Sequence, residues 1–358
     1  MSGLLVLNIG GIGDMVLATP ALRTIAVHME GETFDLLTSE RSVDVIERAP
    51  FIRNIHTIDV SLLTGKRSVR TFFRLIASLF TLLLLRFKRY DTAIDLMAVE
   101  TPQASRRRKF LIDIIQPKTT AGRNTDGQAA FYHAWAPETL SSDVHEVTRK
   151  LSVLSALVYA GESTSLEVFS TEQDGMSAES LIDSIEGHAY RNIAVLIPGS
   201  WRPTRRWAEE NFINTGVYLQ KDHGALVAVC GSRDERDVID RVASGIPGAV
   251  SLIDLPTRVL FELFRRVSIV ITNDTGPMHI AAAARAPIVS IFGPENPRRY
   301  APATDTGRSV ALYRSVECAP CVKYTCDDMR CLRGVDVKMV LEAVDTLLSE
   351  RIGEPANA

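Results

Sequence analysis

The chain has 358 residues, more than one ordinary hydrophobic core accommodates, so we expect two domains of roughly 150 to 180 residues each. Its 46% apolar and 23% charged residues, with 22 Gly and 16 Pro, are typical of a globular protein and exclude wholesale disorder. The net charge of −3 gives no overall signal for nucleic-acid binding.

A buried strand is expected near the N-terminus, where the apolar run 4–9 ends at Gly10 and Gly11. No basic segment and no small-residue cleavage site precede it, so we expect no secretory signal and a cytoplasmic protein. Residues 14–27 predict a helix in which Pro20 marks a kink or a late start. Three further strands are expected in this half, at 33–37, 55–58 and 92–96.

Residues 75–85, LIASLFTLLLL, form the longest apolar run. Eleven residues are too few to cross a bilayer, which needs about 20, so a buried helix is the favoured interpretation. A helix lying in the membrane interface is the alternative, because basic residues flank the run. Lys66 to Lys118 contains twelve Lys or Arg and four Asp or Glu, an excess of eight positive charges that attracts anionic partners such as phosphorylated lipid headgroups.

After a polar stretch at 170–191, the second half repeats the alternation of strands and helices. Its expected strands are 193–197, 226–230, 268–272 and 287–292, and an amphipathic helix at 337–348 follows. This alternation predicts an α/β protein with two doubly wound halves, in which ligands bind beyond the C-terminal ends of the strands. The expected organisation is a domain at 1–170, a linker at 171–190, a second domain at 191–335, and a C-terminal helix and tail at 336–358.

The first strand end, from Asn8 to Asp14, lacks the last glycine of a dinucleotide-binding G-x-G-x-x-G motif. Asp14 stands at the start of a helix, where its charge would repel a pyrophosphate. A carboxylate in this place is commonly a helix cap. Placed over a cleft, the same carboxylate can act as general base and take a proton from a sugar hydroxyl. Both interpretations of Asp14 stay open at this point.

A second candidate site is the loop PGSWRPTRRW at 198–207. Its turn at Ser200 can offer backbone amides to a diphosphate, and Arg205 can offer a guanidinium. The alternative is a solvated basic loop, which Trp201 and Trp207 disfavour because they would order it. After the next strand, Glu235 is the first candidate for hydrogen bonds to ribose hydroxyls and Asp234 the second, although a first-turn helix acid fits equally well.

The segment NDTGPMH at 273–279 carries the strongest signal. Pro277 suits the first position of a helix, so the amides of Thr275 and Gly276 would point out of the helix end, as in anion sites. His279 lies one turn further on and can add a hydrogen bond to the same phosphate. A lone histidine is more often structural, but beside this loop we favour a ligand role.

Together and in this order, these segments resemble the heptosyltransferase family, glycosyltransferase family 9, over most of the chain. The resemblance rests on GDMVLATPALR, IPGSWRPTRRWAEENF and NDTGPMHIAAAARAPIVSIFGP. It implies the GT-B fold, with two Rossmann-like domains facing across a cleft, and inverting, metal-independent transfer of a heptose or related sugar. The implied donor is an ADP-activated nucleotide sugar, ADP-heptose, and the implied acceptor is a lipopolysaccharide core or other glycolipid.

The resemblance also implies roles for matching positions. Asp14 resembles the catalytic base, and Arg205 stands where the family has a donor-binding basic residue, usually lysine. This departure preserves the charge but changes the geometry. Glu235 matches a ribose-binding acid only loosely, and Ser200 lies in the donor-binding turn. The phosphate-binding loop is matched closely by four residues, Asp274, Thr275, Gly276 and His279.

The basic stretch suggests that the acceptor is phosphorylated and held by a membrane. Arg106, Arg107 and Arg108 are the residues that we expect to contact this acceptor and the inner-membrane surface. The enzyme would then be cytoplasmic and peripheral on that membrane.

Four cysteines near the C-terminus follow the spacing C-x2-C-x4-C-x4-C, at Cys318, Cys321, Cys326 and Cys331. This is the spacing of a zinc knuckle, so a structural zinc is one interpretation, and reduced thiols or a disulfide are the others. Four thiolates would leave a metal no open position for catalysis. Asp327 and Asp328 within the cluster argue against nucleic-acid binding.

Three other functions remain to be distinguished. An NAD-dependent oxidoreductase would also have two Rossmann domains, but the broken glycine motif argues against it. A sugar-nucleotide epimerase of GT-B architecture would release nucleotide diphosphate without an acceptor. A non-catalytic lipid- or sugar-nucleotide-binding protein would have no use for Asp14 as a base.

Overall fold

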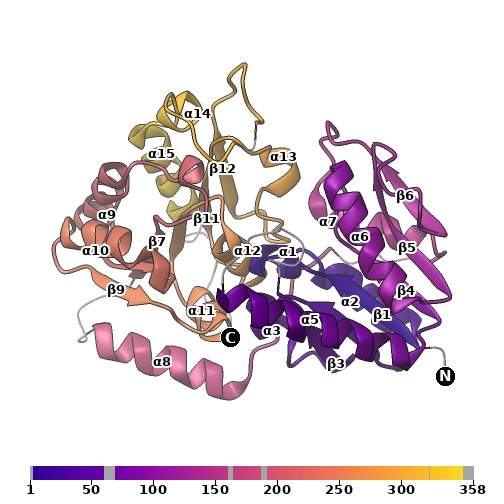
Figure 1. Ribbon diagram of the computed structural model, residues 1–358. Helices are drawn as coiled ribbons and strands as arrows, with labels where there is room; N and C mark the ends of the chain where they lie inside the picture. The colour runs from indigo at the N-terminus through magenta and orange to yellow at the C-terminus, as the bar shows by residue number, and fades with distance from the viewer. Residues whose placement is uncertain (1–2, 60–68, 160–163, 187–191, 322, 350–358) are drawn as a thin grey trace. The chain divides into compact units, whose positions relative to one another are not determined.

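Both halves of the chain fold around a six-stranded, wholly parallel sheet (Figure 1). The computed structural model describes residues 3–59, 69–159, 164–186, 192–321 and 323–349. The chain divides into two compact units, Met1–Phe169 and Ser170–Ala358. Parts of three predicted segments lie outside the described residues: 66–68 of the basic stretch, 187–190 of the linker, and 350–358 of the tail.

The first unit contains strands with the order β3-β2-β1-β4-β5-β6. These strands are β1 (Leu4–Asn8), β2 (Phe34–Thr38), β3 (Ile52–Thr57), β4 (Thr92–Asp95), β5 (Thr119–Thr125) and β6 (Ala134–Glu138). The helices are α1 (Ile12–Val16), α2 (Thr19–His28), α3 (Val43–Ile46), α5 (Val69–Lys88), α6 (Pro102–Ile115) and α7 (Glu146–Ser155), with a 3-10 turn at Glu40–Ser42.

Strand β1 is buried along its whole length, as expected of a strand covered on both faces. Its alternate residues Leu5 and Leu7 join a core cluster with Leu82 of α5 and Leu111 of α6. The predicted helix 14–27 is divided into α1 and α2, because Pro20 occupies the first turn of α2, where its missing amide costs no hydrogen bond.

The second unit has the strand order β12-β11-β10-β7-β8-β9. These strands are β7 (Asn192–Ile197), β8 (Ala225–Gly231), β9 (Val250–Ile253), β10 (Ile269–Asn273), β11 (Ile288–Phe292) and β12 (Ser309–Tyr313). The helices are α8 (Glu172–Glu186), α9 (Glu209–His223), α10 (Arg236–Ser244), α11 (Thr257–Phe264), α12 (Gly276–Ala283), α13 (Pro297–Tyr300), α14 (Arg330–Arg333) and α15 (Val337–Ser349), with 3-10 turns at Pro203–Arg205 and Arg233–Glu235.

In chain order, both sheets therefore have the arrangement 3-2-1-4-5-6 of a Rossmann fold, and the predicted α/β class is confirmed. The segment expected to be a linker contains α8, which belongs to the second unit. This helix is held to α11 and its C-terminal flank by ion pairs of Asp174 with Arg258, at 3.2 Å, and of Glu179 with Arg266, at 2.8 Å.

The long apolar helix differs from the favoured prediction. Helix α5 buries only one face, which includes Leu82 and Leu85, and leaves a second apolar face exposed. Among the helices of the described ranges, none is long and apolar enough to cross a membrane.

Candidate functional site

The candidate residues gather where the strand order of each sheet reverses. In the first unit the reversal lies between the neighbouring strands β1 and β4, and in the second unit between β7 and β10. The loops that leave the C-terminal ends of parallel strands diverge at such a point and open a crevice for ligands. Asp14 follows β1, the loop with Arg205 follows β7, and Asp274 follows β10.

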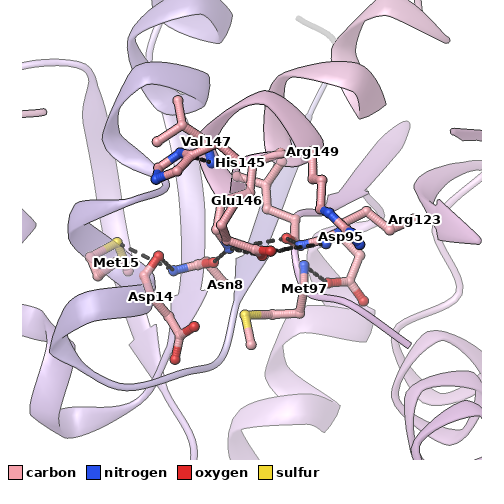
Figure 2. A network of polar contacts seen from close by, with 12 residues as sticks. Asn8, Asp14, Met15, Asp95, Met97, Arg123, His145, Glu146, Val147 and Arg149 are labelled. Carbon is pink, nitrogen blue, oxygen red and sulfur yellow. Dashed lines mark hydrogen bonds and ion pairs between the residues drawn. The ribbon is translucent and has the colours of Figure 1, made fainter. Parts of the chain in front are cut away.

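Asp14 caps helix α1 with one of its two carboxylate oxygens. Its Oδ2 accepts a hydrogen bond of 2.9 Å from the backbone amide of Gly11, the residue that precedes α1. The side chain is half-buried, and within the described part of the chain no hydrogen bond to Oδ1 is found. Figure 2 shows the Asp14 carboxylate directed away from the polar network that includes Asn8 and Glu146. Capping therefore fixes the orientation of Asp14 without using up its ability to accept a proton.

A buried polar network supports the loop that carries Asp14. The Asn8 side-chain amide donates to the backbone carbonyl of Asp14, at 3.3 Å, and to the sulfur of Met15, at 3.7 Å (Figure 2). The ammonium of Lys150 donates to Asn8 Oδ1 and to the carbonyl oxygen of Leu96, both at 3.2 Å. Asn8 thus links β1, the Asp14 loop and α7.

Lys150 was not predicted to take part in a site. It is fully buried, and burial lowers the pKa of its ammonium, whereas the nearby charges of Glu146 and Asp14 act in the opposite direction. No local signal pointed to Lys150, because it is adjacent to Arg149 in a stretch where a solvated pair of basic residues is the ordinary interpretation. Only the packing of α7 against the sheet brings Lys150 to Asn8, which supports the Asp14 loop.

A second buried cation, Arg123 of β5, completes this network. Its guanidinium lies 3.2 Å from Glu146 through Nη2 and 3.0 Å from Glu138 through Nε. Although burial works against the charge, these two carboxylates raise the pKa of Arg123. The network is paired internally, so it serves to hold α7, β5 and β6 together beneath the Asp14 loop.

Of the three arginines expected on the surface, the prediction is wrong for Arg108. Arg108 is buried and pairs with Asp95 at 2.8 Å, and the same carboxylate accepts a 2.7 Å hydrogen bond from Tyr132. Arg108 faces inward because it lies on the side of α6 that packs against the end of β4. Arg106 is exposed and Arg107 half-buried, so these two can still meet an acceptor.

In the second unit, Asn273 ties the two strand-end loops together. Its Oδ1 accepts a 3.0 Å hydrogen bond from the amide of Trp207, and its Nδ2 donates to the carbonyl of Pro198 at 2.8 Å. Trp207 is buried and donates its indole N–H to the carbonyl of Val335 at 2.7 Å. The loop at 198–207 is therefore ordered, and the alternative of a loose solvated loop is wrong.

Arg205 points toward the start of α12. Its Nη1 lies 3.2 Å from Asp274, and its Nη2 pairs with Glu295, a residue that was not predicted. Arg202 joins the same carboxylate at 2.8 Å. Two guanidinium groups and two carboxylates thus meet in one place, and these ion pairs fix the guanidinium of Arg205 beside the start of α12.

Asp274 is 3% exposed, and burial raises the pKa of its carboxyl to about 6. The charge of Glu295 adds to this rise, whereas Arg205 and Arg202 oppose it. Ser200 lies against the same loop, with its hydroxyl 3.5 Å from the carbonyl of Asp274. The predicted residues Ser200, Arg205 and Asp274 are therefore neighbours.

Helix α12 begins as its sequence predicts. Thr275 is the N-cap in an extended conformation, and Pro277 lies in the first turn. Thr275 and Gly276 are partly exposed, so the amides of this helix end lie near the surface beside Asp274, where an anion could reach them. His279 is buried one turn further along the helix.

Glu235 caps a turn, as the second interpretation expected, and its contact with ribose stays a prediction. Its Oε2 accepts from the amide and the hydroxyl of Ser232, at 3.0 and 2.7 Å, and so caps the 3-10 turn at Arg233–Glu235. The carboxylate also fills the space beside Gly199, at the end of β7, because a Cβ atom at that position would overlap it. Glu235 therefore borders the loop that contains Arg205.

The four clustered cysteines are free thiols that line one small pocket with Thr204 and Met329. Cys318 is exposed and Cys331 buried, and burial raises the pKa of the Cys331 thiol. Within the described ranges, no group of three or more His, Cys, Asp or Glu side chains is arranged to hold a metal ion. No disulfide joins these four cysteines, and structural zinc and reduced thiols both stay open as interpretations.

The raised pKa of Asp274 predicts that the free energy of unfolding depends on pH. The folded-state pKa of about 6 lies above the ordinary value of 3.8, so between these values the folded chain holds a proton that the unfolded chain has released. The resulting stabilisation is complete below pH ~4 and is lost as pH rises through 6, on the order of 3 kcal/mol. Asp274→Asn should therefore gain in free energy of unfolding relative to wild type between pH 4 and 7.

Urea denaturation of both proteins at a series of pH values measures this difference. Asp113→Asn, which removes an exposed carboxylate that pairs with Lys109, is the control and should follow the wild-type curve. Parallel curves for wild type and Asp274→Asn would contradict the expected titration.

Taken together, the two units define a class of enzyme. A half-buried carboxylate after the first strand of one Rossmann-like unit, and guanidinium groups beside a helix N-terminus in the other, are elements that a sugar transfer from a nucleotide donor can use. This is the class of the GT-B glycosyltransferases.

The comparison with known proteins identifies the family. Residues 85–331 match the family model of glycosyltransferase family 9 (heptosyltransferase), and the chain belongs to this family. Lipopolysaccharide heptosyltransferase 1 of Pseudomonas aeruginosa is 26% identical over 328 residues, which cover 90% of this chain and 86% of that protein. The chain is thus a glycosyltransferase, as its sequence resemblance predicted.

Solved structures confirm the GT-B fold. A family 9 glycosyltransferase of Veillonella parvula aligns with a TM-score of 0.77 and 21% identity, over 98% of this chain and 97% of that chain. The E. coli ADP-heptose lipopolysaccharide heptosyltransferase II aligns with a TM-score of 0.72 and 17% identity, over 98% and 100% of the two chains.

Proposed function

We propose that this glycosyltransferase moves a heptose from ADP-heptose to a sugar hydroxyl of a lipopolysaccharide core, with inversion at the anomeric carbon. The observation that carries the proposal is the position of Arg205 beside Asp274 and the start of α12. A cation and a helix end together suit a leaving nucleotide diphosphate. Two similar proteins support the choice of donor and acceptor. The E. coli heptosyltransferase II is named for ADP-heptose and lipopolysaccharide, and the Pseudomonas aeruginosa heptosyltransferase 1 is named for lipopolysaccharide.

In this mechanism, Asp14 accepts the proton of the acceptor hydroxyl as its oxygen attacks the anomeric carbon. The new glycosidic C–O bond forms while the bond from that carbon to the β-phosphate oxygen breaks. The electron pair of the broken bond leaves with ADP. Arg205 and the amides of Thr275 and Gly276 stabilise the added negative charge, Ser200 and His279 line the phosphates, and Glu235 binds the ribose.

Charge on the protein replaces a divalent metal in this proposal, and the acceptor is held by the cytoplasmic face of the inner membrane. Arg106 and Arg107 would contact acceptor phosphates, since both remain available at the surface. Arg108 is omitted because its guanidinium is committed to Asp95.

A donor screen tests the proposal. Purified enzyme is incubated with ADP-, UDP- or GDP-sugars and a truncated lipopolysaccharide core, and product is detected by mass spectrometry. We expect a heptose-sized mass increase of the acceptor with ADP-heptose alone, release of ADP that requires acceptor, and an unchanged rate in EDTA.

Other outcomes of the screen contradict specific parts of the proposal. Nucleotide diphosphate released without acceptor would indicate an epimerase. Transfer from a UDP- or GDP-sugar would replace the donor, and loss of activity in EDTA that Mg²⁺ restores would refute metal independence.

A further inference from the structure

Helix α5 is apolar on two faces, of which the first unit uses only one. On the inner face, Leu82 and Leu85 are fully buried in the core cluster that contains Leu5 and Leu7 of β1. Ser78, on the same face, is also buried, and its hydroxyl accepts a 2.9 Å hydrogen bond from the amide of Asp59. These contacts fix which side of the helix faces the sheet.

The outer face of α5 is a continuous exposed apolar stripe. The structure leaves sixteen large apolar side chains exposed in its described ranges, and seven of them belong to this helix. They recur three or four residues apart and are 42% to 80% exposed: Phe73, Ile76, Leu79, Phe80, Leu83, Leu84 and Phe87. Phe110 of the neighbouring helix α6 is 49% exposed as well. Isolated exposed apolar residues are ordinary, but a contiguous patch marks a surface that meets a partner.

Positive charge surrounds the stripe. No acidic residue occurs in Val69–Lys88, and Arg86 and Arg89 are exposed at the C-terminal end of the helix. Arg74 and Lys88 also reach the helix surface, where they pair with Asp59 and Asp35 at 3.4 and 2.8 Å. On α6, Arg106 is exposed, and the exposed Lys109 pairs with Asp113 at 2.8 Å.

This combination favours an anionic lipid surface over a second copy of the chain. Two copies that paired through this face in a symmetric dimer would bring the same cations together, whereas a lipid surface with negative headgroups would neutralise them. A helix with aromatic and aliphatic residues on one side and basic residues at its edge is suited to lie in the plane of a bilayer interface.

We propose that the outer face of α5 lies on an anionic bilayer, with Phe73, Phe80 and Phe87 inserted at the boundary between headgroups and acyl chains. Because the inner face holds α5 to the sheet, the helix docks parallel to the membrane. The inference deepens the proposed function, because it brings the enzyme to the surface that holds a glycolipid acceptor. Vesicle binding needs no donor, so it can be tested independently of sugar transfer.

The experiment compares full-length wild type with the triple variant Phe73→Ser/Phe80→Ser/Phe87→Ser in sedimentation with phosphatidylethanolamine–phosphatidylglycerol vesicles. Wild type should bind, and the triple variant should bind at least about tenfold more weakly, because interfacial binding scales with buried apolar area. Wild type should also bind phosphatidylcholine vesicles less well than anionic ones. Val27→Ser/Leu140→Ser/Val144→Ser, which changes three exposed apolar residues elsewhere in the same unit, is the matched control and should bind like wild type.

Two further measurements separate docking from folding and from catalysis. The urea midpoint of the triple variant should equal that of wild type, since the three side chains lie outside the core. Transfer to a water-soluble, delipidated core oligosaccharide should also be unchanged, so a failure of the proposed sugar transfer would appear in that assay and not in vesicle binding.

Three results would overturn the proposal. In the first, the wild-type protein does not sediment with anionic vesicles. In the second, the triple variant binds these vesicles as strongly as the wild type does. The third is a wild-type protein that binds no vesicles and forms a dimer in analytical ultracentrifugation, which the triple substitution converts to a monomer. That result would make the stripe an interface between two copies of the chain.

Discussion

Asp14→Asn is expected to lower kcat for sugar transfer by about 10²- to 10⁴-fold, the usual contribution of a general base. The asparagine side-chain oxygen can still accept the hydrogen bond that Asp14 takes from Gly11, so the loop and α1 should keep their structure. The amide cannot accept the proton of the acceptor hydroxyl. Donor affinity should be unchanged, because Arg205 and α12 supply the phosphate contacts in the proposed mechanism.

Steady-state kinetics with ADP-heptose and acceptor measure the fall in kcat, and calorimetry with ADP measures donor affinity. Asp113→Asn, which removes an exposed carboxylate of the same unit, serves as control and should leave both values unchanged. Near-normal turnover of Asp14→Asn would remove Asp14 from the role of base and leave it a helix cap.

Arg205→Ala should weaken donor binding and slow the release of the leaving group, with a fall in kcat/KM of about 10²- to 10³-fold, the range found for loss of one fixed donor to a developing charge. The same substitution leaves the buried Asp274 without its 3.2 Å partner. Removing one member of a buried ion pair costs about 3 to 5 kcal/mol of stability, so a simple loss of activity could reflect a damaged fold.

A second substitution separates these two effects. Arg205→Ala combined with Asp274→Asn removes the unpaired charge, so it should recover free energy of unfolding without recovering donor affinity. Arg205→Lys should retain more activity than Arg205→Ala, because it keeps the charge but loses the planar fork. Unfolding in urea and calorimetric titration with ADP test both statements. Unchanged donor affinity and rate in Arg205→Ala would exclude Arg205 from the site.

The strands that carry the candidate site were predictable from sequence, whereas β5 and β6 were not. The ends of β1, β7 and β10 combine an apolar run with glycine or a polar turn, and each signal is local. Strand β5 reads TTAGRNT, which resembles a loop. It is buried because Glu138 and Glu146, distant in sequence, neutralise Arg123, and such pairing cannot be read from the segment itself.

Tertiary packing, which the sequence of a single segment does not show, also determines the partners of the predicted site residues and the orientation of α5. Glu295 and Lys150 reach the two sites only through tertiary packing, and neither lies in a motif that implies a role. In α5 apolar residues cover both faces, so the hydrophobic pattern does not show which side meets the sheet. The prediction of a fully buried helix failed for that reason.

Gly10 and Gly199 have a consequence for how these loops can vary. Neither adopts a backbone conformation that demands glycine, yet a Cβ atom at Gly10 would lie 2.5 Å from Oδ2 of Asp14, and one at Gly199 would overlap Glu235. At each of these two glycines, the space that a side chain would need is filled by a carboxylate from further along the chain. Saturation mutagenesis should find Gly10 intolerant of even alanine, because the Cβ atom of Asp14 would lie 2.6 Å away, whereas alanine in place of Gly199 should only displace the flexible end of Glu235. A search for active residues based on chemistry alone would overlook both positions.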